Sequence, residues 1–255
     1  MAPLIDDVAI GTSAPDRHLL RHAAGLLAAS VPGVCRPLVA YGAERYDAFL
    51  ARALTPPPAH RSLLLRGVTA GTELIAVADW RILPDALFLN GVAVRDDHRG
   101  RGIGTRILAD GEAIATRLRL ATMLLDVSLG NASAHRLYRR NGFTDTELSA
   151  WCWHEPHPGH DQPATAVTLI VDWASLWAQH DAYGFGDCSV RGLDGGIRTV
   201  RVVGDRVRAA SAADAVVVSR ALAIRDRPLR AYRIISDATA GQPFARFIRM
   251  RKQLR

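Results

Sequence analysis

The sequence lacks several features that mark other classes of protein. No apolar run approaches the roughly 20 residues that a membrane-spanning helix needs, and the start of the chain lacks the basic and then apolar pattern of a secretory signal. Cysteine is scarce: Cys35, Cys152 and Cys188 are scattered over 255 residues. Three scattered cysteines make no disulfide framework, so we expect reduced thiols and a cytoplasmic protein.

Lysine is also nearly absent, since Lys252 is the only one and arginine carries the remaining positive side-chain charge. The formal net charge is +7, but it is unevenly distributed. Residues 1–172 hold 17 basic and 18 acidic residues, whereas residues 173–255 hold 15 basic and seven acidic ones. This asymmetry predicts a larger domain over residues 1–172 and a separate basic region over residues 173–255.

The hydrophobic patterns predict an α/β fold. Apolar residues at helical spacing indicate helices over residues 15–30, 43–54, 103–118 and 132–140. Apolar or alternating runs indicate strands over residues 7–11, 60–68, 72–80, 83–94, 121–127, 144–153 and 164–171. Short turns between residues 60 and 94 favour an antiparallel meander. Beyond residue 172 we expect a short helix at 173–180, and then a mostly β region with segments at 196–203, 213–224, 229–236 and 244–251. No internal repeat is evident.

A glycine-rich turn carries the strongest functional signal. Residues 99–104 read Arg-Gly-Arg-Gly-Ile-Gly and separate the apolar strand at 83–94 from the helix at 103–118. Glycine permits unusual backbone dihedrals and leaves amides uncovered. A helix N-terminus attracts anions, and arginine adds charge beside them. The turn is therefore expected to bind a diphosphate.

Two other interpretations of these glycines compete with that one. In a plain turn without a ligand, the glycines would only allow the backbone dihedral angles that the turn needs. In a dinucleotide-binding fold, an acidic residue such as Asp126 would follow about twenty residues later. That fold places its glycine motif directly after the strand, whereas five polar residues, Arg95 to Arg99, intervene here, and position 105 is a threonine.

The pattern resembles the acyl-CoA motif of the GNAT superfamily of N-acetyltransferases. That motif is a strand followed by Arg/Gln-x-x-Gly-x-Gly/Ala, which corresponds to Val92-Ala93-Val94 and then Arg99-x-x-Gly102-x-Gly104. The family's second signature is matched further along the chain by Asn131, Ala134, Leu137, Tyr138, Gly142 and Phe143. The resemblance covers about residues 5–172. It implies the GNAT fold, a mixed and mostly antiparallel sheet flanked by helices.

The resemblance also implies roles for individual residues, with acetyl-CoA or another acyl-CoA as co-substrate and no metal. The strand backbone would bind the pantetheine arm, and the turn amides would bind the pyrophosphate. The positions expected to contact the cofactor are Val92, Ala93, Val94, Arg99, Gly100, Arg101, Gly102, Ile103, Gly104, Thr105, Asn131, Ala134 and Tyr138.

Tyr138 is the expected general acid. It stands where many family members place a tyrosine near the thioester sulfur, and a phenol is protonated at neutral pH. It would then protonate the departing thiolate. Alternatively, Tyr138 only packs beside Phe143.

The general base is harder to identify. Many members carry a carboxylate in the strand before the motif, but this chain has Asn90 there, and an amide is not a base. Asp126, which with Ser128 ends the next strand, is the expected base, acting directly or through water. Asp85 is a second candidate. Alternatively, Asp126 is only a hydrogen-bonded loop carboxylate.

Three histidines follow the strand at 144–153, namely His154, His157 and His160. Their spacing is compatible with a metal site, but the intervening prolines and glycine indicate a loop without fixed geometry. We therefore expect no metal, and a polar loop beside the acceptor pocket.

These expectations combine into an N-acetyltransferase that transfers an acetyl group directly to an amine of a small molecule or peptide. One alternative is a GNAT-fold sensor that binds acyl-CoA without transfer, which Asn90 favours. Another is a donor group carried by an acyl-carrier protein or tRNA, bound by the basic region 173–255. That region, where arginines alternate with apolar residues, would otherwise be a solvated sheet face or a homodimer contact.

Overall fold

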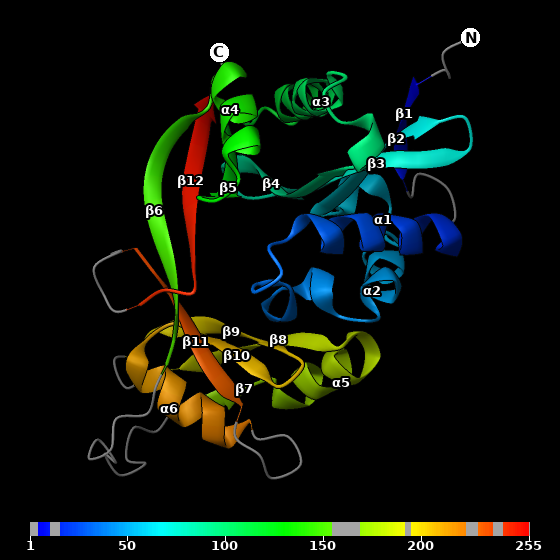
Figure 1. The fold of residues 1–255 in the computed structure, drawn as a ribbon. Helices are drawn as coiled ribbons and strands as arrows, with labels where there is room; N and C mark the ends of the chain where they lie inside the picture. Colours follow the sequence, from blue (N-terminus) through cyan, green and yellow to red (C-terminus); the bar gives the residue numbers. More distant parts are fainter. Residues whose placement is uncertain are drawn as a thin grey trace. The chain divides into compact units, whose positions relative to one another are not determined.

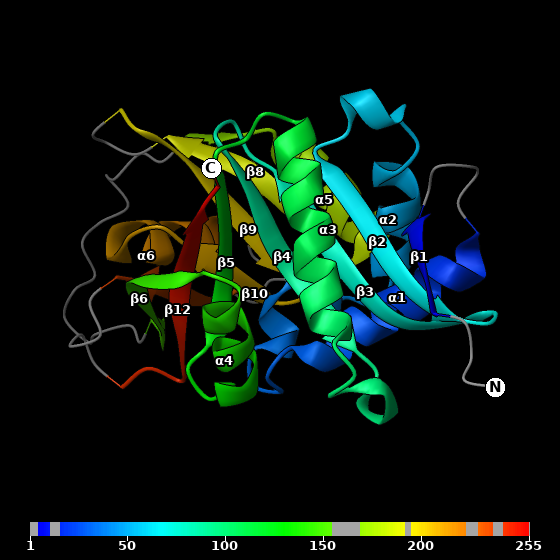
Figure 2. The same cartoon turned by 90° about the horizontal axis from the view of Figure 1, so that it is seen from above.

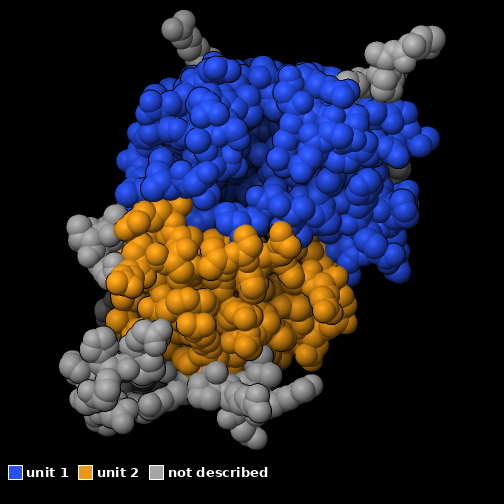
Figure 3. Space-filling view, in the orientation of Figure 1, with its two compact units in different colours: residues 1–32, 47–148, 247–255 blue, residues 33–46, 149–246 orange. Residues whose placement is uncertain are grey.

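The computed structural model describes residues 5–10, 16–154, 169–191, 195–222, 229–236 and 242–254 (Figure 1). The chain forms two compact units (Figure 3). Unit 1 comprises residues 1–32, 47–148 and 247–255, and unit 2 comprises residues 33–46 and 149–246. These units do not coincide with the expected boundary at residue 172, because the chain leaves unit 1 within strand β6 (Thr144–Trp153) and returns within β12 (Ala245–Gln253).

Unit 1 is built on a mixed, mostly antiparallel sheet, as the sequence predicts. Its strands are β1 (Ile5–Ile10), β2 (Leu63–Ala70), β3 (Glu73–Ile82), β4 (Ala86–Val94), β5 (Thr122–Ser128) and β12, hydrogen-bonded in that order. Among the described pairings of these strands, only that of β4 with β5 is parallel. Parallel neighbours need a crossover connection, which helix α3 (Ile103–Arg117) supplies.

Helices cover both faces of this sheet (Figures 1 and 2). α3 and α4 (Ala132–Arg140) lie on one face, and α1 (Arg17–Ser30) and α2 (Tyr46–Ala53) lie on the other. The fully buried Trp80 of β3 fixes how closely α3 approaches. A Cβ at Gly111 of α3 would lie 2.4 Å from the Trp80 ring, so only glycine fits there.

The predicted helix at 132–140 and strand at 144–153 match α4 and β6 at both ends. Local signals explain this accuracy. The side chain of Asn131 caps α4 by accepting a hydrogen bond from the Ala134 amide at 3.1 Å. Gly142, with φ of +84°, lets the chain turn out of the helix.

In its described residues, unit 2 contains the second part of β6 and five further strands. In hydrogen-bonded order after β6 these are β11 (Arg230–Ile235), β10 (Arg206–Ala209), β9 (Ile197–Val203), β8 (Phe185–Arg191) and β7 (Leu169–Val171). Two helices, α5 (Trp173–Tyr183) and α6 (Ala212–Ala221), accompany them.

The expected strand at 213–224 is wrong, because its described part forms helix α6. Three successive valines at 216–218 suggested a strand, but the preceding residues start a helix. The Ser211 hydroxyl oxygen accepts a hydrogen bond from the Asp214 amide at 3.0 Å. The same hydroxyl donates to the Asp214 carboxylate at 2.8 Å. This capping arrangement outweighs the β preference of valine.

The two units repeat one topology, although the sequence shows no repeat. Unit 1 has the order β1, helices, β2, β3, β4, α3, β5, and unit 2 has β7, α5, β8, β9, β10, α6, β11. In each unit the first four strands pair antiparallel, and the last pair, joined by a helix, is parallel. The closing strands are exchanged: β12 pairs with β5, and β6 pairs with β11. Within the described residues, no helix is long and apolar enough to cross a membrane.

Buried thiols in unit 2 predict a loss of stability at alkaline pH. Burial raises the pKa of Cys35 and of Cys188 from 9.0 to about 11. Between these values the unfolded chain releases a proton that the folded chain retains. The stabilisation is therefore complete below pH 9 and is lost as the pH rises toward 11. From about pH 8 to about pH 10, the free energy of unfolding should fall by about 1 kcal/mol per thiol.

Urea denaturation at both pH values in the presence of a reductant measures this change. The Cys188→Ala variant should show a smaller pH dependence than the wild type, whatever its absolute stability. Equal pH dependence in the two proteins would contradict the assignment.

Candidate active site

The glycine turn adopts a backbone conformation that side chains resist. Gly100 and Gly102 have φ of +75° and +77°, in the left-handed region. A Cβ at either position would meet nothing within 4 Å, so the space beside both residues is open. These residues are therefore glycine because of their backbone dihedral angles and not for lack of space, and no side chain covers the amides next to them.

The N-terminus of α3 begins at this turn and has no side-chain cap. By contrast, Asp16 caps α1 and Asn131 caps α4. The first hydrogen bond of α3 runs from the Arg106 amide to the Gly102 carbonyl at 3.1 Å. Three predicted cofactor-binding residues, Ile103, Gly104 and Thr105, lie in this first turn. Their backbone amides, at the positive end of the helix dipole, can receive an anion.

Gly104 has a different reason to be glycine. A Cβ there would lie 2.7 Å from the Cδ2 atom of Leu137 in α4. The residue thus permits the close packing of α4 on α3. Gly100 and Gly102 shape the turn for a ligand, whereas Gly104 keeps the two helices together.

Most charges of the turn are already paired. Arg99 forms an ion pair with Asp96 at 2.7 Å and donates through Nε to the Val94 carbonyl at 3.1 Å. Arg95 bonds Asp97 and Glu73, and it holds the pKa of both carboxyls below their usual range. Arg101 is exposed and has no ion pair with any described residue. Arg101 is therefore the guanidinium most available to a bound diphosphate.

An opening between β4 and β5 follows from the strand pairing. The parallel register ends at the pair Leu89 and Leu125. Beyond it, residues 92–94 pair only with β3, and residues 126–128 pair with β12. One backbone edge at Val92, Ala93 and Val94 therefore faces the opening. Figure 3 shows a hollow in the surface of unit 1 close to where Figure 1 draws β4.

A β-bulge lies at the same point of β4. Asp79 of β3 is opposite Gly91, and the next residue, Trp80, is opposite Leu89. Asn90 is thus an extra residue in β4 without a counterpart in β3. Such bulges bend a strand and redirect a side chain.

Tyr138 lies on α4 and is 5% exposed. Its ring centroid is 6.0 Å from that of Phe143, so the packing contact exists. Burial raises the pKa of Tyr138 to about 12, which keeps the phenol protonated at neutral pH. The residue has the protonation state that an acid needs.

Asn131 and Ala134 occupy the first turn of α4. The Asn131 carbonyl oxygen accepts hydrogen bonds from the Ala134 amide and from the Ser133 hydroxyl, at 3.1 and 3.0 Å. Its side-chain NH₂ is therefore the group that can donate to a cofactor. Ala134 is half-buried and packs against the core under α3 and α4.

Asp126 is held by an arginine from the other end of the chain. Its two carboxylate oxygens accept from Nε and Nη2 of Arg249 in β12, at 2.5 and 2.8 Å. The pair raises the pKa of Arg249. Asp126 thus lies within strand β5, not in a loop, and is paired with Arg249. Asp85 precedes β4, at the end of that strand away from the opening.

Sequence reasoning missed Asp79, which is completely buried. Its carboxylate accepts two hydrogen bonds from Arg81, at 2.8 and 2.7 Å, and one from Nδ2 of Asn90, at 2.9 Å. The available signal was an aspartate and an arginine at alternate positions of an otherwise apolar strand. A charged pair in such a strand needs an explanation.

No metal site is found: among the described residues, no group of three His, Cys, Asp or Glu side chains could hold an ion. His154 lies at the end of β6, where its amide bonds the Ala231 carbonyl at 3.0 Å. His157 and His160 lie outside the described residues.

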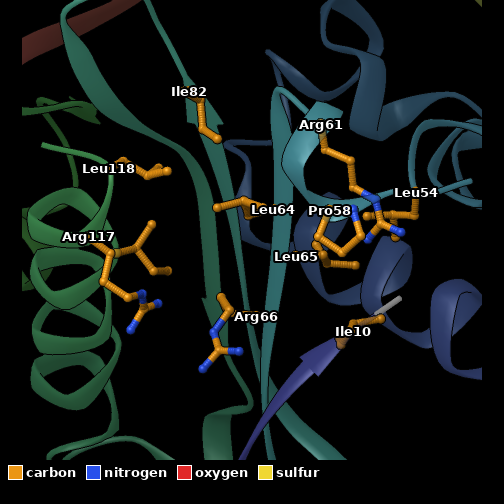
Figure 4. Close-up of a pocket in the computed structure, with 11 residues that line it drawn as sticks. Ile10, Leu54, Pro58, Arg61, Leu64, Leu65, Arg66, Ile82, Arg117 and Leu118 are labelled. Atoms are coloured by element: carbon orange, nitrogen blue, oxygen red, sulfur yellow. The ribbon is translucent and has the colours of Figure 1, made fainter. Parts of the chain in front are cut away.

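A pocket of about 190 Å³ lies elsewhere in unit 1 (Figure 4). It is lined by residues of β2 and by Ile114, Arg117 and Leu118 near the C-terminal end of α3. A helix of 15 residues spans about 20 Å, which separates this pocket from the glycine turn. It is therefore distinct from the candidate cofactor site.

Comparison with known proteins agrees with this geometry. Residues 33–143 match the model of the Acetyltransferase (GNAT) family. The structure of a GCN5-related N-acetyltransferase from Sphaerobacter thermophilus is 18% identical with a TM-score of 0.62, and the match covers 98% of this chain and 96% of that one. A tandem GNAT protein from the clavulanic acid biosynthesis pathway is 12% identical with a TM-score of 0.66, and the match covers 98% of both chains. No curated protein matches.

Residues 33–143 therefore match a GNAT acetyltransferase domain, and the chain has the GNAT fold, as its motifs predict. The family's general activity is N-acetyl transfer from an acyl-CoA co-substrate.

Replacing Gly102 by alanine should weaken acetyl-CoA binding at least about tenfold, because a Cβ distorts the left-handed turn and intrudes beside its amides. Isothermal calorimetry measures the dissociation constant. The matched control is Gly71→Ala, since Gly71 also has positive φ and open space but lies in the turn between β2 and β3. Both variants should lose about 1 kcal/mol of stability. If Gly71→Ala weakens binding as much as Gly102→Ala, the turn has no specific role.

Proposed function

We propose that unit 1 transfers an acetyl group from acetyl-CoA directly to an amine of a small molecule or peptide. The observation that carries this proposal is the uncapped N-terminus of α3, behind Gly100 and Gly102 and next to the opening between β4 and β5. An anion-binding helix end beside a strand edge with unpaired backbone groups suits a diphosphate linked to a pantetheine arm. Arg101 adds an available positive charge.

In the proposed reaction the amine nitrogen attacks the thioester carbonyl carbon. The carbon–sulfur bond then breaks, and the sulfur leaves as a thiolate. Tyr138 donates its proton to this thiolate and recovers one from water. Burial keeps the phenol of Tyr138 protonated at neutral pH, so a proton is present to donate.

The proton released by the amine needs another destination. Asp126 is occupied by Arg249 on both oxygens, so direct abstraction by Asp126 would first have to break a bidentate ion pair. We therefore propose that water carries this proton away, and that Asp126 fixes Arg249 beside the opening. The Arg249 guanidinium lies 5.5 Å from the Phe88 ring centroid, which gives this wall of the site a cationic and aromatic character.

A sensor without transferase activity is the second candidate, since no described carboxylate stands unpaired in the site where a base would act. Release of free thiol from acetyl-CoA in the presence of amines separates the two functions. A panel of glycine, spermidine, an aminoglycoside and a peptide with a free N-terminus covers the main acceptor classes. A sensor would bind acetyl-CoA and release no thiol with any of them.

A carrier protein or RNA bound at unit 2 finds less support. Several arginines expected to form a basic face are paired with aspartates. Arg201 bonds Asp187 through both guanidinium branches, at 2.7 Å, and Arg206 bonds Asp205 at 2.6 Å. These pairs reduce the charge available to a polyanion. The buried free thiols of Cys35, Cys152 and Cys188 fit a reducing compartment, so we propose a cytoplasmic location.

We further propose that each chain binds a single acetyl-CoA. In unit 2 only Ala210 and Ser211 join β10 to α6, and neither is glycine. Ser211 also caps the first turn of α6, and the buried Asp214 carboxylate places negative charge there. An anion would therefore be repelled from the position that corresponds to the glycine turn of unit 1. Calorimetric titration with acetyl-CoA should give one site per chain, and two equivalent sites would contradict this account.

Replacing Tyr138 by phenylalanine should lower kcat by roughly 10²-fold, because the thiolate then leaves without a proton donor. The dissociation constant for acetyl-CoA should stay within about threefold, since the ring still packs beside Phe143. Stopped-time thiol release measures kcat, and calorimetry measures binding. The wild-type rate should also show no alkaline decrease below about pH 11, because the acid has a pKa of about 12. Unchanged turnover in Tyr138→Phe would exclude the acid role.

A further inference from the structure

Arg249 of β12 places its charge where β4 and β5 separate. The last parallel pair, Leu89 and Leu125, faces the core under α3. Phe88 directly precedes Leu89, and Asp126 directly follows Leu125. Because side chains alternate along a strand, Phe88 and Asp126 project from the opposite face of the sheet. The Arg249 guanidinium donates to the Asp126 carboxylate and lies 5.5 Å from the Phe88 ring centroid. It therefore spans both strands at the start of the opening.

These two contacts hold the guanidinium in one orientation. A guanidinium is planar, and each of two edges can bind a carboxylate through two parallel N–H groups. Asp126 occupies the edge formed by Nε and Nη2, at 2.5 and 2.8 Å. The Phe88 ring adds a cation–π contact from the neighbouring strand. The direction of the second edge is therefore fixed as well.

The second edge of the Arg249 guanidinium is formed by Nη1 and the remaining N–H of Nη2. Within the described part of the chain, no acceptor bonds to Nη1. The Arg249 side chain is 41% exposed, so the core does not enclose it. An oriented and accessible pair of N–H donors matches the two oxygens of a carboxylate.

The charges around this edge cancel one another. Arg249 is balanced by Asp126, and Glu147 of β6 acts on Arg249 by charge. Arg251 lies two residues further along β12, on the same face; it is exposed and, among the described residues, forms no ion pair. Its charge offsets that of Glu147. Directed hydrogen bonds, not an excess of positive charge, must therefore hold a ligand here, which favours a carboxylate over a doubly charged phosphate.

We propose that the acceptor is an amino acid, and that the second edge of Arg249 binds its carboxylate. The inference rests on the transferase function proposed above and narrows the class of acceptor. The amino nitrogen forms the bond to the acetyl carbon, the carbon–sulfur bond breaks, and the carboxylate takes no part in these changes. The products are an N-acetyl amino acid and the thiol of CoA. Polyamines and aminoglycosides, which carry no carboxylate, lack this contact.

Matched pairs of an amino acid and its amide isolate the contact, because the amide keeps the amino group and the side chain but lacks the carboxylate. Thiol release gives kcat/KM for both members of each pair, over the standard amino acids and β-alanine. In the pair that the wild type acetylates fastest, kcat/KM should be at least about tenfold higher for the acid, as expected for a charge-assisted hydrogen bond.

Two variants remove the second edge. Arg249→Lys keeps a positive charge beside Asp126 but has no planar edge, and it should lower the acid-to-amide ratio of kcat/KM at least about tenfold. The double variant Arg249→Gln/Asp126→Asn removes both members of the ion pair, so no carboxylate is left unpaired, and it should lower the ratio equally. The ratio cancels any general loss of activity or of folded protein. Calorimetric binding of acetyl-CoA should stay within about threefold in both variants.

Arg251→Gln is the matched control. Arg251 lies on the same strand and face but opposite Leu124, in the paired part of β5. Its replacement removes one positive charge and should leave the acid-to-amide ratio within about threefold of the wild type.

The inference is overturned if the wild type acetylates amides or spermidine as well as amino acids, if Arg249→Lys keeps the ratio, or if Arg251→Gln lowers it equally. In each of these cases an amine is still acetylated, so the proposed function stands. A wild type that binds acetyl-CoA but acetylates no amine would instead overturn the proposed function, and this inference with it.

Discussion

The separation of β4 from β5 is the constraint on which the site depends. Parallel strands normally continue their hydrogen bonds, yet this pair stops at Leu89 and Leu125. Unpaired backbone groups inside a protein are costly unless something else satisfies them. Here β3 is hydrogen-bonded to one edge of β4, and β12 is hydrogen-bonded to the edge of β5 that faces away from β4. Each strand therefore keeps one partner, and only the edges that face the opening are left for a ligand.

The same separation explains features that otherwise look unrelated. The extra residue in β4 bends the strand where it must diverge, and it places Asn90 beside the opening. The strand then continues into the glycine turn, which delivers the uncapped end of α3. Gly104 lets α4 pack closely on α3, so Tyr138 is held by the same pair of helices. The candidate acid and the anion site thus follow from one local geometry.

Sequence reasoning reached the features that depend on local chemistry. Asn131 and Gly142 mark the ends of α4, and the glycine turn follows from its residues alone. It failed where the role of a residue depends on contacts with residues far away in the sequence. The partner of Asp126 is Arg249, 123 residues away, so the ion pair that limits Asp126 as a base was not visible. Asp79 was missed because an acidic residue in an apolar strand has no meaning until Asn90 and Arg81 are placed beside it. The strand expected at 213–224 was wrong for a local reason, because Ser211 caps a helix there and this cap outweighs the β preference of the valines.

The repeated topology changes what the C-terminal part of the chain means. A basic appendage after residue 172 would be separable from the transferase domain. However, β12 completes the sheet of unit 1, supplies Arg249 to Asp126 and buries Met250 in the core under α3. Without it, β5 would become an exposed edge beside the opening, with an unpaired row of backbone groups. A truncated chain would therefore lose part of the proposed site itself. If removal of the residues after 172 weakened the binding of a partner protein or RNA, the loss could therefore not be assigned to unit 2 alone.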